Sequence, residues 1–108
     1  MAQEIDEAWV EEAITRYRRI EQLQAEFDAR VGKTEVTVHS PDQLVEVLVC
    51  ADGSVRRVTI VGSLQGRTNA EVSRSIEAAI SAAADAAEWA RRTLYAETFG
   101  GYAPLKGA

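Results

Sequence analysis

Residues 34–61 read TEVTVHSPDQLVEVLVCADGSVRRVTIV and contain three short runs in which polar and apolar side chains alternate. The runs cover residues 34–39, 44–51 and 55–61. Each run places branched apolar side chains on one face: Val36 and Val38, then Val45, Val47 and Val49, then Val58 and Ile60, with Val61 on the other face of the third run. A period of two is typical of strands that bury one face of a sheet. We therefore predict three β-strands.

Two tight turns separate these runs. Ser40-Pro41-Asp42-Gln43 has a proline that fixes φ and an aspartate that can bond to the backbone beyond it. Asp52-Gly53 between β-branched runs is a strong hairpin signal, because glycine tolerates the positive φ of such turns. The three strands are therefore expected to form an antiparallel meander, which needs a helix packed on it for stability.

A long helix is predicted before the strands, over about residues 5–31. Its apolar positions repeat every seven residues with one polar exception, Gln24: Val10, Tyr17, Gln24 and Val31, with Ala13, Ile20 and Phe27 between them. Such a helix would be about 40 Å long, which exceeds any core that 108 residues can form. Part of the helix therefore needs a partner. Gly32 is expected to end it as a left-handed cap.

A second long helix is predicted over residues 70–98, after a short linker at residues 62–67. Thr68 and Glu71 match a capping box at its start. Its expected apolar stripe is rich in alanine: Val72, Ile76, Ile80, Ala83, Ala87, Ala90 and Leu94. Gly100 and Gly101 are expected to end it, leaving residues 1–101 as one domain and residues 102–108 as a flexible tail.

Composition and charge exclude several classes of protein. Twelve lysines and arginines against 17 acidic residues give a net charge of −5, which argues against a polycation that coats nucleic acid. A single cysteine excludes an internal disulfide framework. The acidic first residues do not resemble a signal peptide, and no apolar run is long enough to span a membrane. We therefore expect a cytoplasmic protein.

The order of long helix, three-stranded meander and long alanine-rich helix resembles the YbaB/EbfC family of bacterial nucleoid-associated proteins. The similarity is carried by Glu35 to Asp42, Leu44 to Val47, Asp52 to Ile60 and Gly62-Ser63-Leu64. The last segment resembles the family's Pro-Ser-Leu exit from the sheet, with Gly62 in place of the common proline. The Ser-Pro-Asp turn is most similar to the actinobacterial branch.

This resemblance implies an α+β protomer that forms a homodimer through its central region and projects its helices like the arms of tweezers. It also implies sequence-tolerant binding of double-stranded DNA in the nucleoid, with no catalytic activity, no cofactor and no membrane partner. In such a mechanism arginines contact phosphates and displace counterions, with little readout of the bases.

Seven arginines are the candidate DNA-binding residues: Arg16, Arg18, Arg19, Arg56, Arg57, Arg91 and Arg92. The first three form the densest basic cluster, and we favour pairing with neighbouring glutamates on a solvated face over phosphate contact as their explanation. Arg91 and Arg92 are also explained by the dipole at the end of a helix. Arg56 and Arg57, expected on opposite faces of a strand, bind phosphate or protect a sheet edge from aggregation.

Other residues give weaker signals. The loop at 62–68 precedes a helix N-terminus, where anions bind, but the capping box already uses the amides. His39 and Cys50 are each the only residue of their kind, so no metal-ligand set is completed, and Cys50 is more simply a small packed side chain. Trp9, Trp89, Tyr17 and Tyr95 are expected to be packing or interface anchors.

The main alternative is a protein-interaction paralogue that has kept the scaffold and lost DNA binding, for instance a secretion-system accessory factor. The acidic balance, the presence of only two lysines and the tryptophans on both helices favour it.

Overall fold

The computed structural model describes residues 7–100 and contains two helices and one three-stranded sheet. In chain order the elements are α1 (Glu7–Lys33), β1 (Glu35–His39), β2 (Val45–Cys50), β3 (Val55–Ile60) and α2 (Asn69–Phe99). The strands lie in the order β1-β2-β3, and both neighbouring pairs are antiparallel. The predicted α+β fold with a central meander is confirmed. The predicted tail at residues 102–108 lies outside the described residues.

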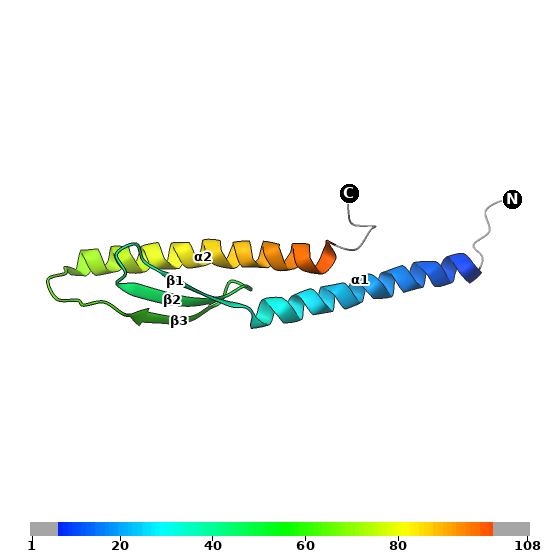
Figure 1. Cartoon of the computed structure of the whole chain (residues 1–108), viewed down its shortest axis with the longest axis horizontal. Helices are drawn as coiled ribbons and strands as arrows, with labels where there is room; N and C mark the ends of the chain where they lie inside the picture. Colours follow the sequence, from blue (N-terminus) through cyan, green and yellow to red (C-terminus); the bar gives the residue numbers. More distant parts are fainter. Residues whose placement is uncertain (1–6, 101–108) are drawn as a thin grey trace.

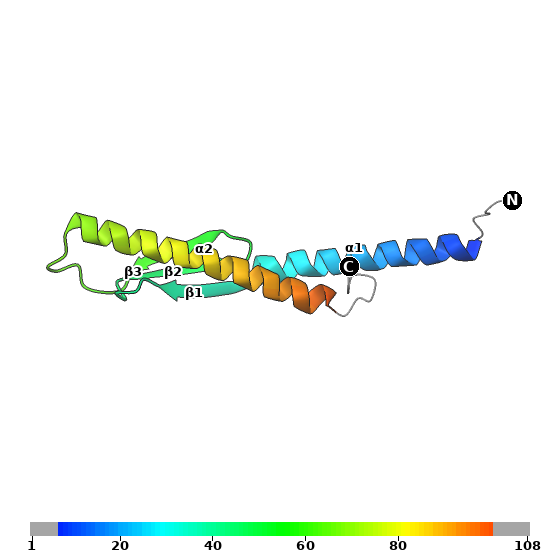
Figure 2. The same cartoon turned by 90° about the horizontal axis from the view of Figure 1, so that it is seen from above.

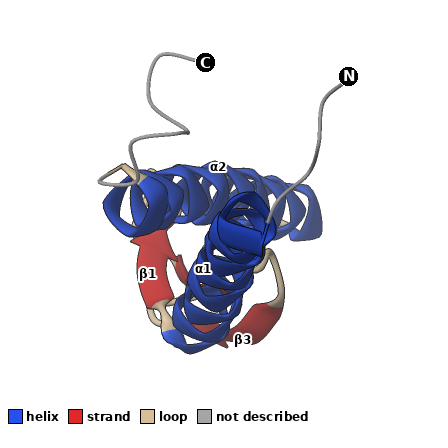
Figure 3. Cartoon of the chain, turned by 90° about the vertical axis from the view of Figure 1, so that its right-hand side faces the viewer, coloured by secondary structure: helices blue, strands red, loops and turns tan. Residues whose placement is uncertain are grey.

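The core lies between α2 and the central strand. Viewed along the long axis, α2 lies across one face of the sheet (Figure 3). Three groups of side chains fill this layer: Leu44, Val45, Val47 and Val49 from the sheet, Ala79, Ala83 and Ala87 from α2, and the half-buried Val36 and Val38 from β1. Alanine allows the helix axis to approach the sheet closely, which explains why so many are needed here.

The apolar stripe of α2 differs from the prediction at one position. Ala79 is fully buried, whereas Ile80 is 37% exposed. The buried positions 79, 83, 87, 90 and 94 follow the helical repeat, and Ile80 lies one residue further around the helix. The inclusion of Ile80 in the stripe was wrong, because position 80 lies beside the buried row of α2 and not within it.

β3 is the strand that α2 leaves uncovered. Val58 and Ile60 pair with Val47 and Val45 and so share their face of the sheet. Yet Val58 is 44% exposed, whereas Val47 is fully buried. One helix covers two strands, and the third keeps an exposed apolar strip.

Within residues 7–100, the buried side chains of α1 lie in the second half of the helix. Leu23 and Val31 are buried, and Val31 forms a second small core with Ala51, Ala90 and Leu94. Residues 7–22, called the arm here, project beyond the sheet and the end of α2 (Figures 1 and 2). The radius of gyration is 21.9 Å, against about 13 Å for a compact chain of this size.

The left-handed cap expected at Gly32 is absent. α1 continues to Lys33, and the glycines with positive φ among the described residues are Gly53 and Gly66. The backbone N–H and the hydroxyl of Thr34 both donate to the Arg30 carbonyl, at 3.0 and 2.7 Å. The last turn is therefore satisfied without a left-handed glycine.

Three aromatic rings fix the point where the helices separate. Tyr95 stacks on Phe99 with ring centroids 4.6 Å apart, and Phe27 meets the edges of both rings. Of the heptad positions predicted for α1, Phe27 and Val31 are packed within the protomer, whereas Val10, Tyr17 and Ile20 are exposed. The apolar seam therefore continues along the arm past the last contact with α2.

Candidate nucleic-acid interface

The three arginines of the arm surround it and do not form one row. Arg16 and Arg19 are three residues apart and lie on neighbouring sides of the helix, whereas Arg18 lies on a different side. Arg16 contacts Glu12 at 3.2 Å, which is the predicted pairing within the helix. Among the described residues, Arg18 and Arg19 form no ion pair. These two guanidiniums therefore extend into solvent on a helix that nothing covers.

The two candidate arginines of α2 also differ in whether they form an ion pair. Arg92 pairs with Glu88 at 2.6 Å, whereas Arg91 has no ion-pair partner within residues 7–100. Arg91 lines a hollow of about 210 Å³ with Asp52 and Gly53 of the β2–β3 hairpin. It also lines a hollow of about 500 Å³ beside the aromatic rings. Arg91 therefore lies where α2, the hairpin and the end of α1 meet.

A bulge changes the arrangement expected for Arg56 and Arg57. Leu48 pairs with Arg57 and Val49 with Val55, so Arg56 is the extra residue of β3. The strict alternation predicted for these two arginines is therefore interrupted. Arg56 lies 3.9 Å from Asp52. Arg57 shares the face of Leu48, which is the face away from α2.

The seven candidate arginines do not share one surface of the protomer. The arm carries three of them beyond the aromatic rings, while Arg91 and Arg57 lie on opposite sides of the helix–sheet layer. The structure does bring Arg56 and Arg91 to the same end of the sheet, because both lie beside the β2–β3 hairpin. Any ligand that contacts all seven must therefore reach around the molecule or bridge two copies.

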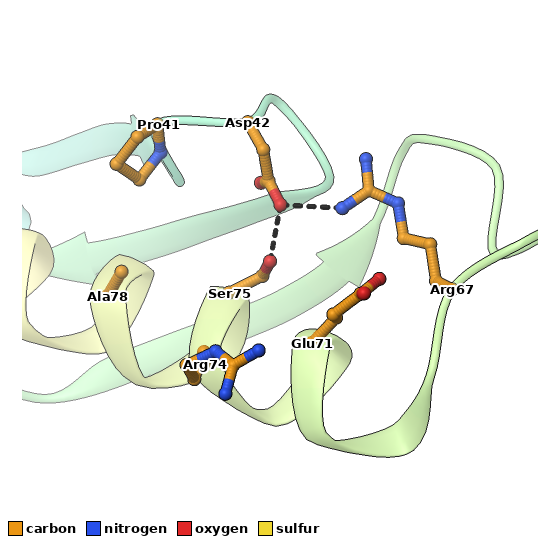
Figure 4. Close-up of a pocket in the computed structure, with 7 residues that line it drawn as sticks. All are labelled: Pro41, Asp42, Arg67, Glu71, Arg74, Ser75 and Ala78. Atoms are coloured by element: carbon orange, nitrogen blue, oxygen red, sulfur yellow. Dashed lines mark hydrogen bonds and ion pairs between the residues drawn. The ribbon is translucent and has the colours of Figure 1, made fainter.

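A second polar cluster lies at the β1–β2 turn, at the end of the sheet away from the β2–β3 hairpin (Figure 4). From the sequence, only the turn itself was predicted here. The Asp42 carboxylate accepts hydrogen bonds from the hydroxyls of Ser40 and Ser75 and from the Arg67 guanidinium. These bonds join the β1–β2 turn, the linker and α2. Ser40, fully buried, also accepts the backbone N–H groups of Leu44 and Val45 at 3.1 and 3.0 Å.

This cluster holds three segments of the chain together and has charged side chains beside it. The Ser40 hydroxyl, then Ser75 and Arg67, hold the pKa of Asp42 well below its ordinary value. Arg74 and Glu71 line the adjacent hollow of about 340 Å³ (Figure 4). Because the Asp42 oxygens are already bonded from three sides, the carboxylate is occupied with holding the turn. The Ser-Pro-Asp motif was the sequence signal for the turn itself. The bonds from Arg67 and Ser75 to Asp42 depend on the tertiary fold, so no sequence signal pointed to them.

His39 and Cys50, the residues considered for metal binding or catalysis, lie far apart. The Cys50 thiol is buried and donates to the Val31 carbonyl at 3.1 Å. His39 contacts Glu46 on β2. Glu46 and Cys50 are four residues apart on this strand, which is a distance of about 13 Å. No three His, Cys, Asp or Glu residues within 7–100 come together as a metal site. The structure thus supports the packed role for Cys50 over a Cys–His pair.

The comparison with known families agrees with this architecture. The sequence profile of the YbaB/EbfC DNA-binding family matches residues 7–102. The chain belongs to the YbaB/EbfC DNA-binding family. The resemblance found in the sequence is thereby confirmed, and the actinobacterial branch stays a prediction.

The YbaB/EbfC family is a family of DNA-binding proteins and not a family of enzymes. No curated protein sequence matches the chain. Within the described part of the chain, neither YbaB/EbfC helix is long and apolar enough to cross a membrane. The matched range covers the arm, the sheet and α2 together, so all seven candidate arginines lie inside the YbaB/EbfC match.

Proposed function

We propose that this chain is a nucleoid-associated protein that binds duplex DNA as a homodimer, with little sequence preference, through arginines of the arm and of the β2–β3 end of the sheet. The observation that carries the proposal is the placement of Arg18 and Arg19, inside the family match, on a projecting helix and without ion-pair partners among residues 7–100. Guanidinium groups held in this way can contact phosphates on either side of the helix.

The proposed dimer interface is the strip of β3 that α2 leaves uncovered. Val58 and Ile60 are exposed apolar side chains on the face of the sheet that α2 covers elsewhere. A helix of a second copy laid on this strip would complete the cover of the sheet. The arms would then project from the central body of the dimer.

Fluorescence anisotropy with a labelled duplex and the full-length protein tests DNA binding. We expect the logarithm of the affinity to fall steeply with the logarithm of the salt concentration. Arg18→Gln should weaken binding, whereas Arg74→Gln, which removes one charge at the far end of α2, should not. Charge reversal of Arg16, Arg18 and Arg19 to glutamate should abolish binding while circular dichroism and dimer mass stay unchanged.

Two results would contradict this proposal. Equal losses from the Arg18 and Arg74 variants would indicate a dependence on net charge and not on the arm. The absence of binding even at low salt would instead favour the protein-interaction alternative. The exposure of Trp9 (58%) and Trp89 (69%) supports that second candidate, because exposed tryptophans are common anchors of protein interfaces. Capture of protein partners with wild-type and Trp89→Ala baits would then test it.

A further inference from the structure

The second half of α1 and the end of α2 enclose a hollow of about 500 Å³, called the notch here. Its described walls are Phe27 of α1 and Arg91, Arg92 and Tyr95 of α2. The notch lies where the two helices contact each other, before α1 projects beyond the end of α2 (Figure 1). Sites that bind small molecules have volumes of about 300–1,000 Å³, so the notch is large enough for one.

The aromatic wall of the notch is held in place from behind. Phe99, which is buried, stacks on the Tyr95 ring with centroids 4.6 Å apart. Phe27 meets the Tyr95 ring at an interplanar angle of 87°. Tyr95 nevertheless stays 49% exposed, so part of its surface is open to the notch. A ring that is fixed on a helix and open on one side is a stacking surface for another planar ring.

The charge of the notch is positive. Arg91 precedes Tyr95 by one helical turn, which places its guanidinium beside the aromatic wall. Glu88 holds Arg92 at 2.6 Å, whereas Arg91 forms no ion pair within residues 7–100. Among the described residues no acidic side chain lines the notch. The hollows beside Asp42 and beside the β2–β3 hairpin each have two, so the notch is the one of these three suited to an anion.

The ligand that fits these walls combines a flat ring with a negative charge. An inorganic anion would leave the aromatic surface unused, and an acyl chain would leave Arg91 with only the charge of its head group. A nucleotide has both parts, because its base stacks on aromatic rings and its phosphate accepts from a guanidinium. Arg91 and Tyr95 are about 5.4 Å apart along the helix axis, so a single nucleotide is long enough to contact both.

We propose that the notch binds one nucleotide, with the base stacked on Tyr95 and the phosphate on the Arg91 guanidinium. This inference goes beyond the proposed function, in which arginines contact the phosphates of paired DNA and no base leaves the duplex. A free nucleotide and an unpaired nucleotide at a gap in DNA offer the same chemistry. Probes of both kinds distinguish these two sources.

The fluorescent base 2-aminopurine tests the notch in the full-length protein. Its deoxynucleoside monophosphate should lose fluorescence on binding, because the base stacks on Tyr95. The nucleoside, which lacks the phosphate, should bind at least about tenfold more weakly. Deoxyribose 5-phosphate, which lacks the base, should compete at least about tenfold less well than the nucleotide. A nucleoside that binds as tightly as the nucleotide would overturn the proposal.

Two substitutions test the two contacts separately. Arg91→Gln and Tyr95→Leu should each weaken nucleotide binding by about five- to tenfold. Arg91 is exposed, so its variant keeps the test decisive if circular dichroism shows that Tyr95→Leu disturbs the aromatic rings. Tyr95→Phe should bind as wild type does, because it retains the ring.

Tyr17→Leu and Arg18→Gln are the matched controls, since both residues are exposed on the arm and outside the notch. Neither should change nucleotide binding. If Tyr17→Leu weakens it as much as Tyr95→Leu does, the probe stacks on any exposed ring and the proposal fails.

Two duplexes identify the source of the nucleotide. One carries 2-aminopurine in a base pair, and the other carries it unpaired at a one-nucleotide gap. A fluorescence change with the gapped duplex alone indicates a DNA ligand, and a change with the monophosphate alone indicates a free nucleotide. Failure of both probes at millimolar nucleotide and micromolar duplex overturns the proposal. An equal change with the paired base also overturns it, because that base is not available for stacking on Tyr95.

The same measurements keep the notch and the proposed function apart. Tyr95→Leu should leave the affinity for a fully paired duplex unchanged, whereas Arg18→Gln should weaken it. If the paired duplex does not bind even at low salt but the monophosphate does, the proposed function fails and the notch stands. If the paired duplex binds and neither unpaired probe responds, the notch fails and the proposed function stands.

Discussion

The Asp42 carboxylate accepts a hydrogen bond from the Ser75 hydroxyl, 33 residues further along the chain. The same carboxylate oxygen lies 2.6 Å from the Arg67 guanidinium. Through these two bonds one aspartate joins the turn between β1 and β2 to the linker and to the first turns of α2. The start of α2 is therefore held by polar contacts, whereas its end is held to α1 by aromatic rings.

Replacement of Asp42 by asparagine should remove a stability that depends on pH. The partners of Asp42 lower its pKa in the folded protein, so near pH 3 the unfolded chain binds a proton that the folded chain does not. The stabilisation is complete above about pH 5 and declines as the pH falls below about 4, the value of an unperturbed aspartate. Urea unfolding midpoints of wild type and Asp42→Asn should therefore differ most at pH 7, and the difference should shrink steadily as the pH falls below about 4.

Asp85→Asn is a suitable control for that experiment, because Asp85 is an exposed carboxylate on α2 and is not among the hydrogen-bond partners of the turn. It removes the same charge from the protein without touching the cluster. A constant difference between wild type and Asp42→Asn from pH 7 to pH 2.5 would contradict the electrostatic explanation.

Ser40→Ala should destabilise the fold by about 2 kcal/mol. The buried Ser40 hydroxyl accepts two backbone N–H groups, and without it the N–H of Val45 loses its acceptor inside the protein. Denaturant unfolding followed by circular dichroism measures this loss. Ser63→Ala, which removes an exposed hydroxyl that caps only the linker, is the matched control and should change stability by less than about 0.5 kcal/mol. Equal effects would show that the hydroxyl of Ser40 is not needed.

Local pattern was sufficient to predict the elements of the fold. The hairpin at Asp52-Gly53 has Gly53 at a φ of 94°, and the capping box of Thr68 and Glu71 is present with both of its hydrogen bonds. Both signals act between residues that are close in sequence, so they do not depend on tertiary packing.

Tertiary arrangement explains what the pattern missed. The error at Ile80 arose because hydrophobicity favours the large side chain, whereas close packing on the sheet requires Ala79. The bulge at Arg56 depends on the register between two strands, which the sequence of one strand does not specify. The bonds from Arg67 and Ser75 to Asp42 likewise form only after α2 has docked on the sheet.

Arg91 and Arg92 should contribute differently to DNA binding although they are neighbours. Glu88 holds Arg92 at 2.6 Å and partly neutralises it, whereas Arg91 lines the open hollow beside the hairpin. Arg91→Gln should reduce affinity by about three- to tenfold and reduce the slope of the salt dependence by about one phosphate contact. Arg92→Gln should reduce affinity by less than about twofold. The reverse order, measured by anisotropy at several salt concentrations, would place the interface on the other side of α2.

Val58→Glu should prevent the proposed homodimer from forming without unfolding the protomer. Val58 lies on the covered face of the sheet but is 44% exposed, because α2 leaves β3 open. A glutamate there is tolerated by a single protomer, since its carboxylate remains in water, but a second copy would have to bury it. Thr59→Glu places the same charge one residue away on the opposite face and should leave the dimer intact. Light scattering coupled to size exclusion measures both masses. If the Val58 variant stays dimeric and the Thr59 variant dissociates, the second copy packs on the face of the sheet away from α2.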